Sequence, residues 1–197
     1  MVDLVESITG VLLASFLFLH LLLISTVMLG NNLFNLLAKF MEDFYLTHTT
    51  MIAILLVLII HVFLTLRRVS FDLSKQVQLI GHLKDINHLD SRLWLLQVIT
   101  GLFLFMFIII HIWSVFVSMP IDVNDISVKL VNIRWAVFNL ILVMLAGIHT
   151  GIGIYRMGIK WGFIKYRKKG LVLISLLIPV YILIEILNLY SFIKIKS

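Results

Sequence analysis

The chain lacks cysteine altogether and has few prolines and few charged residues. Its 197 residues include no cysteine and 2 prolines, and 13% are charged. The lack of cysteine excludes disulfides, thiolate metal sites and cysteine-ligated iron–sulfur clusters on this chain. With 61% hydrophobic residues and a mean hydropathy of +1.11, the chain has too much apolar surface for a soluble domain of this size. The composition therefore predicts an integral membrane protein, and a helical one, because lipid cannot satisfy backbone hydrogen bonds.

Five apolar runs reach the length that spans a bilayer, for which roughly 20 helical residues are needed. They cover residues 7–29, 49–66, 93–117, 133–157 and 171–189. Asp3 and Glu6 stand where a signal peptide would be basic, so we expect a first span there and no cleavable leader. The predicted fold is all-α, a single transmembrane domain over residues 1–197, with five helices of which the first four form an up-down bundle.

The basic residues concentrate in two connections, residues 67–92 and 156–169. The positive-inside rule places these segments and the N-terminus in the cytoplasm, and with five spans the C-terminus lies outside. Lys194 and Lys196 near the C-terminus argue mildly against this orientation. The net charge of +6 is explained by these connections and gives no reason to expect a nucleic-acid partner.

The first two apolar runs are repeated in the next two. In runs one and three a Thr-Gly pair is followed, after nine intervening residues, by a histidine: Thr9-Gly10 with His20, and Thr100-Gly101 with His111. In runs two and four a histidine is followed seven residues later by an arginine: His61 with Arg68, and His149 with Arg156. A parallel repeat of this kind predicts a pseudo-twofold axis along the membrane normal. The fifth run lies outside the repeat.

Four of the seven histidines lie inside the spans, one on each of the first four predicted helices. Ionisable residues inside a membrane are costly and point to function. At about 1.5 Å per residue, His61 and His149 lie about 9–10 Å from the cytoplasmic edge, and His20 and His111 about 20–25 Å. The four histidines thus form two levels with two residues each. The other three, which we expect in loops or at the interface, are His48, His82 and His88.

This arrangement suits two b-type haems with two histidine ligands each. Such a haem needs an imidazole on each face of its iron, from opposing helices, in an apolar surround. In an up-down bundle the first and third helices are diagonal, as are the second and fourth. We therefore predict His20 and His111 as the ligands of one iron, and His61 and His149 as the ligands of the other. The alternative, four core histidines bonded to neighbouring helices, is disfavoured by the paired depths and the repeat.

Haem propionates require cations or hydrogen-bond donors at the membrane edge. The candidates at the cytoplasmic edge are Ser7, Arg68, Trp94, Arg156 and Lys160. Each basic residue among them could equally be charge that sets the topology.

Together these stretches resemble the membrane anchors of succinate:quinone oxidoreductases with one anchor subunit and two haems, typified by the fumarate reductase of epsilonproteobacteria. The stretches that match are Ser7-Ile-Thr-Gly…His20, His61…Arg67-Arg68, Lys84…Trp94…Gln97…His111, and His149-Thr-Gly-Ile-Gly…Arg156…Lys160-Trp161-Gly162. They run through the first four helices.

The resemblance implies that His61 and His149 bind the proximal haem and His20 and His111 the distal one. Ser7, Trp94 and Lys160 match positions that bind proximal propionates, whereas Glu6 stands where the family has an amide. The implied activity is transfer of electrons between menaquinone and an iron–sulfur subunit, itself docked partly on the 67–92 segment. On the same resemblance, a flavoprotein subunit carries the fumarate site, the membrane is a bacterial inner membrane, and whole complexes could pair as dimers.

Quinone is expected near the distal haem, where the family uses a carboxylate to accept the quinol proton. A direct match puts Met41 at that position and Glu42 one residue later. Glu42 is therefore the candidate proton acceptor, although it and Asp43 could be ordinary solvated acids.

One position departs from the family. Some relatives carry an acid two residues before the fourth histidine, thought to carry protons across the membrane, and here Gly147 stands there. The fifth span contains an intramembrane acid, Glu185. Proton compensation is therefore predicted to be absent or rerouted.

Two other functions fit parts of the pattern. A di-haem cytochrome b could anchor another quinone-linked enzyme, such as a hydrogenase or a formate dehydrogenase. A haem-free transporter could use intramembrane histidines for protons or metal ions, and it would show no haem absorption. The repeated Thr-Gly…His motif and the Lys-Trp-Gly segment favour the succinate:quinone oxidoreductase anchor.

Overall fold

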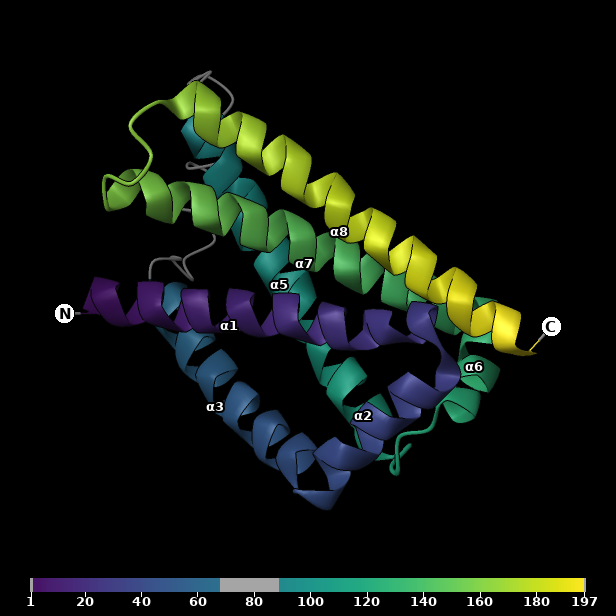
Figure 1. The fold of residues 1–197 in the computed structure, drawn as a ribbon. Coiled ribbons are helices and arrows are strands. Elements are labelled where there is room, and N and C mark those ends of the chain that lie inside the picture. The colour runs from purple at the N-terminus through teal and green to yellow at the C-terminus, as the bar shows by residue number, and fades with distance from the viewer. Residues whose placement is uncertain (1, 68–88, 197) are drawn as a thin grey trace.

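The structure, a computed structural model, describes residues 2–67 and 89–196, and every regular element in these ranges is helical (Figure 1). Five helices are long and apolar enough to cross a membrane. They are α1 (Val2–Ser25, extended by the 3-10 turn η1, Thr26–Leu29), α3 (Leu46–Leu66), α5 (Leu89–Phe116), α7 (Ile133–Lys160) and α8 (Arg167–Lys196). The prediction of an all-α protein with five spans is confirmed. The helices extend a few residues beyond most of the predicted limits because polar end residues continue the backbone hydrogen bonding.

Two shorter helices occupy segments that the hydropathy pattern leaves as connections: α2 (Asn31–Asp43) and α6 (Val123–Val131). Both are too short to span, and each packs one apolar side on the ends of the long helices. Phe34 of α2 and Val123 of α6 meet Val27 of η1 and Phe192 of α8 in one buried cluster. The side chain of Asp122 caps α6 by accepting a hydrogen bond from the Asn124 N–H. This cluster closes one end of the bundle.

The long helices run up and down, as the sequence predicts. In Figure 1 the N-terminus and the α7–α8 connection lie at one end of the molecule, and α2, α6 and the C-terminus lie at the other. Helix α1 packs on α3, α5 packs on α7, and α8 lies along α7. Gly147 and Gly151 of α7 lie directly against α8, because a Cβ at either position would be in van der Waals contact with α8 side chains at 3.4 Å.

The α7 helix is the most deeply placed of the first four spans. Eight of its residues are buried: Leu142, Val143, Ala146, Gly147, Gly151, Ile152, Tyr155 and Gly158. Across α3, which the structure describes in full, Leu58 alone is buried. Most large apolar side chains on the outer faces are exposed, as expected where lipid replaces water as the solvent. The two repeated units therefore sit in different surroundings.

Candidate functional site

The first repeated unit joins His61 of α3 to the Thr-Gly pair of α1. The Thr9 Oγ1 atom lies 3.0 Å from His61 Nδ1, and Thr9 is buried between the helices. A Cβ on Gly10 would lie 3.3 Å from His61 Cε1, so the ring rests against the bare backbone of α1. An alanine at position 10 would require the ring to shift by a few tenths of an ångström, and a larger side chain would require more.

The second unit joins His149 of α7 to the Thr-Gly pair of α5 in the same way. The Thr100 Oγ1 atom lies 3.4 Å from His149 Nδ1, and the carbonyl oxygen of Gln97 lies 3.0 Å from it. A Cβ on Gly101 would approach His149 Cε1 to 2.8 Å. The sequence repeat is thus also a repeat of contacts, with each Thr-Gly pair seating the histidine of the next span.

The contact with Gln97 indicates which ring nitrogen of His149 can bind a metal. A carbonyl oxygen only accepts hydrogen bonds, so the Gln97 contact assigns the proton to Nδ1 of a neutral His149. The lone pair is then on Nε2, the nitrogen farther along the ring from α5. Metal-bound histidines are commonly oriented by such a bond from the other nitrogen. Thr9 places its hydroxyl at the equivalent nitrogen of His61.

The deeper pair, His20 and His111, meets across the bundle. Their ring centroids lie 6.1 Å apart and the ring planes are nearly perpendicular, at 83°. Phe16, one turn earlier on α1, stacks on His20 with a centroid distance of 5.4 Å. Two histidines from α1 and α5 therefore face each other, and their role as a ligand pair stays a prediction.

These residues fit a bis-histidine haem. With metal–nitrogen bonds of about 2 Å on each side, the centroids of two axial imidazoles are separated by about 6 Å. The observed 6.1 Å between His20 and His111 matches this separation. The glycines against His61 and His149 keep bulk away from the rings, and no thiolate competes for iron since the chain contains no cysteine.

At the end of the bundle nearest the N-terminus, several predicted edge residues come together. The Trp161 Nε1–H donates to the Ser7 hydroxyl at 3.0 Å, and Lys160 Nζ lies 3.3 Å from an Asp3 carboxylate oxygen. Arg67 pairs with Asp3 at 2.8 Å. Ser7 and Lys160, 153 residues apart in sequence, therefore belong to one polar cluster at one membrane edge.

The remaining predicted edge residues are placed differently. The Nη1 of Arg156 instead donates a hydrogen bond to the Gln97 side chain on α5, at 2.6 Å. Trp94 is half-buried on α5. Arg68 and the histidines at 82 and 88 lie outside the described residues.

At the opposite end, Glu42 is part of the contact between α2 and the segment before α6. Its Oε1 accepts a hydrogen bond from the Ile121 N–H at 2.6 Å. Asn35, two turns earlier on α2, bonds to the Asp122 side chain and to the Val123 N–H, both at 3.0 Å. The candidate proton acceptor therefore lies at the predicted end of the bundle, where it also ties α2 to its neighbour.

Near the deeper pair, Lys129 of α6 is a cation that sequence reasoning did not single out. Its ammonium donates to the side chains of Ser114 on α5 and of Ser118 just beyond it, and lies 4.4 Å from the Trp135 ring centroid. Ser114 is three residues beyond His111, on the same helix face. Burial lowers the pKa of Lys129 below its ordinary value.

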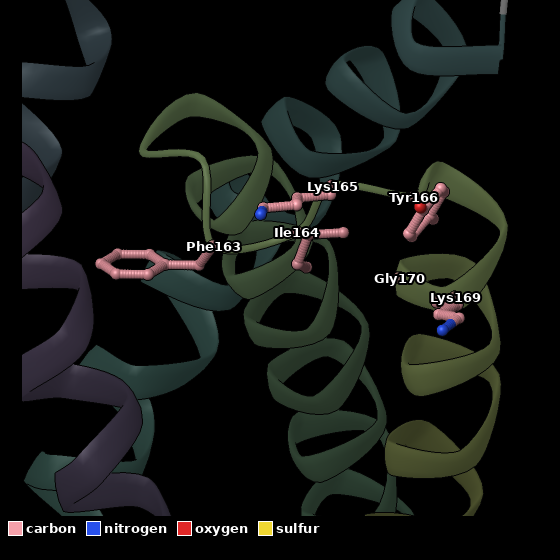
Figure 2. Close-up of a pocket in the computed structure, with 6 residues that line it drawn as sticks. All are labelled: Phe163, Ile164, Lys165, Tyr166, Lys169 and Gly170. Carbon is pink, nitrogen blue, oxygen red and sulfur yellow. The ribbon is translucent and has the colours of Figure 1, made fainter.

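A separate pocket of about 460 Å³ lies at the α7–α8 connection (Figure 2). It is lined by Phe163, Ile164, Lys165, Tyr166, Lys169 and Gly170. None of the four intramembrane histidines lines it, so it is distinct from the candidate haem positions.

Comparisons with known proteins identify the family of the chain. The family model described as the succinate dehydrogenase/fumarate reductase transmembrane subunit matches residues 75–184, more than half of the chain. The chain belongs to this family. The fumarate reductase cytochrome b subunits of two Helicobacter pylori strains are each 28% identical over 173 residues, which cover 83% of this chain and 68% of the relative. The subunit of that name from Wolinella succinogenes is 27% identical over 168 residues, covering 80% and 65%.

Membership of the succinate dehydrogenase/fumarate reductase transmembrane subunit family confirms the predicted family and the multi-pass membrane character of the chain. Sequence reasoning found the Thr-Gly pairs as markers of the repeat but missed their contact with the histidines. It also missed the Gln97 carbonyl, which carries no side-chain signal at all. The sequence did contain a signal for this contact. Each span with a Thr-Gly pair is followed by a span with a histidine, as expected if the pair and that histidine touch.

Proposed function

We propose that the chain is the membrane-anchor cytochrome b subunit of a quinol:fumarate reductase or succinate:quinone oxidoreductase. It belongs to the transmembrane subunit family of these enzymes, and relatives that are 27–28% identical to it are named fumarate reductase cytochrome b subunits. The observation that carries the proposal is the repeated seating of His61 and His149, together with the 6.1 Å pairing of His20 and His111.

In this proposal the four histidines hold two haems b, which supply one-electron carriers inside the membrane. His61 and His149 provide the ligands nearer the N-terminal end of the bundle, and His20 and His111 the ligands farther from it. Thr9, Thr100 and the Gln97 carbonyl orient the first two rings through Nδ1. Lys129 of α6 would lie at the edge of the haem held by His20 and His111, where its propionates or solvent would be.

The polar cluster at the N-terminal end suits the cytoplasmic edge of an inner membrane. Ser7, Trp94 and Lys160 would hold propionates there, with Arg68 and Arg156 as additional donors from the same edge. The pairing of Lys160 with the Asp3 carboxylate at 3.3 Å supports a role for its ammonium in binding a propionate. The iron–sulfur subunit would dock at this end, and the flavoprotein subunit with the fumarate site would lie beyond it.

Menaquinone would react at the opposite end, with Glu42 taking the quinol proton. The Ile121 N–H donates a 2.6 Å hydrogen bond to Glu42 Oε1, which holds the side chain at this end of the bundle. Replacing Glu42 by Gln should lower the rate of quinol oxidation while leaving both haems bound. An unchanged rate would remove Glu42 from this role.

The test of the proposal is a reduced-minus-oxidised spectrum with pyridine-haemochrome quantitation on the detergent-purified chain and its co-purifying subunits. Two b haems per chain, with a flavin and iron–sulfur signals in the same sample, are the expected result. One haem would show that one histidine pair is wrong. Two haems with a different catalytic partner would favour the hydrogenase or formate dehydrogenase anchor, and no haem in a folded sample would favour a transporter.

A further inference from the structure

Helix α8 carries polar residues on its buried side and apolar residues on its outer side. Glu185 is 7% exposed and Asn188, three residues later on the same face, is 1% exposed. The neighbouring residues that turn outward are apolar or aromatic: Leu183, Ile186, Leu187 and Tyr190. The two polar side chains therefore face the interior of the bundle, where burial of a carboxyl and an amide is costly.

These buried groups lack the partners that would explain them as structure. The side-chain nitrogen and oxygen of Asn188 are both without a hydrogen-bond partner, and the Glu185 carboxyl makes no hydrogen bond or ion pair within residues 2–67 and 89–196. A buried polar group that contributes no bond to the fold requires another explanation, such as a function or an ordered water. The α8 face therefore provides a polar position that can exchange a proton.

Glu185 lies at the level of the deeper histidine pair. Helices α1 and α8 run in the same direction in Figure 1, and Ile24 and Leu189 pack against the same buried cluster. His20 is four residues before Ile24, and Glu185 is four residues before Leu189. Each therefore lies about one helical turn, roughly 5.4 Å, before that cluster.

Few titratable groups share this level. Three segments pack near this level: η1, residues 135–148 of α7 and the facing part of α1. The only titratable residue among them is His20. On α6, Asp125 is exposed and Lys129 points its ammonium at α5. On α8 itself the nearest titratable residues are Tyr181, one turn before, and Tyr190, which is exposed. Glu185 is thus the carboxyl at this depth whose charge can change.

We propose that Glu185 binds the proton that balances each electron entering the deeper haem, with Asn188 as its hydrogen-bonding neighbour. This inference rests on the proposed function, whose quinol supplies the electron. As one electron arrives, the Glu185 carboxylate takes up one proton from the aqueous side nearer the C-terminus and becomes a carboxylic acid. As the electron leaves, the proton is released, so the charge buried at this level stays constant.

The test is a redox titration of the purified complex at a series of pH values across neutrality, following the haem that is lost in a His20→Ala variant. In the wild type, uptake of one proton per electron lowers that haem's midpoint potential by up to about 59 mV per pH unit, because each unit is a tenfold change in proton concentration. Glu185→Gln should flatten this slope, and Glu185→Asp should keep it. Ser191→Ala is the matched control, since it removes an α8 hydroxyl that bonds only within its helix, to Leu187 O.

Infrared difference spectra give a readout that does not depend on turnover. Reduction of the wild-type complex should produce the C=O band of a newly protonated carboxyl, and Glu185→Gln should remove it. A pH-independent potential in the wild type overturns the inference even if the Gln variant does not assemble. Two bound haems with an unchanged slope in Glu185→Gln overturn this inference alone, whereas a wild-type complex without haem overturns the proposed function as well.

Discussion

The α1–α3 and α5–α7 units carry the same motif in different surroundings. In both, a threonine hydroxyl and a bare glycine backbone seat the histidine of the next helix. In the second unit α7 is covered by α8 and has eight buried residues, whereas α3 buries Leu58. The Thr-Gly motif therefore determines which atoms contact each histidine. The neighbouring helices determine how far the helix that carries the histidine can move when that contact is changed.

Removal of either histidine at the shallower level should have the largest effect. His61→Ala and His149→Ala should each lower the haem content from two to one per chain, since an iron between two helices needs both axial ligands. Pyridine-haemochrome quantitation measures this directly. His48→Ala is the control, because His48 is exposed in the first turn of α3 and should leave two haems bound. Loss of haem in only one of the two variants would show that the α1–α3 and α5–α7 units do not contribute equally to haem binding.

Glycine substitution should separate the two units. In Gly101→Ala the new Cβ would lie 2.8 Å from His149 Cε1, which forces the ring to shift and costs about 1–3 kcal/mol. In Gly10→Ala the distance is 3.3 Å, and the better helix propensity of alanine, about 1 kcal/mol, offsets the strain.

Haem retention during thermal unfolding would compare the two glycine variants. The expected order is a clear loss for Gly101→Ala and a nearly unchanged value for Gly10→Ala. Equal effects would mean that the His149 ring on α7 can shift as easily as the His61 ring on α3.

Removal of the threonine hydroxyls should have a smaller effect, with the order reversed. Thr9→Val removes a contact of 3.0 Å to His61, worth about 0.5–1.5 kcal/mol. Thr100→Val removes a longer contact of 3.4 Å, and the Gln97 carbonyl still holds His149 at 3.0 Å. Haem dissociation measured by transfer to an apoprotein acceptor should therefore quicken more in Thr9→Val. A larger change in Thr100→Val would show that the Gln97 contact does not orient the ring.

The ion pairs at the membrane edge should contribute least and about equally. Arg67–Asp3 links α3 to α1 at 2.8 Å, and Arg167–Asp90 links α8 to α5 at 2.6 Å. All four side chains are substantially exposed, so each pair is worth less than about 1 kcal/mol and weakens with salt. Replacing either arginine by Gln should shift the melting temperature by a few degrees at low salt and less at high salt. A large, salt-independent loss would indicate a buried role.

Much of the fold was accessible from the sequence because hydropathy acts over contiguous residues. The apolar runs predicted all five spans, and the depth of each histidine followed from the helical rise alone. The amphipathic helices α2 and α6 were missed since each is short and its polar face hides its helical period in the hydropathy pattern. The repeat indicated which spans are equivalent, but not which of them touch.

The sequence by itself determined the membrane class, the five helices, the repeat and the four intramembrane histidines, because these depend on composition, length and spacing. Only the tertiary structure decided that Thr9 and Gly10 seat His61, that the Gln97 carbonyl holds His149, and that α8 turns Glu185 and Asn188 inward. The physical reason is that such contacts join residues some 50 or more positions apart. Their existence depends on how whole helices rotate and pack, which the local pattern of one helix does not fix.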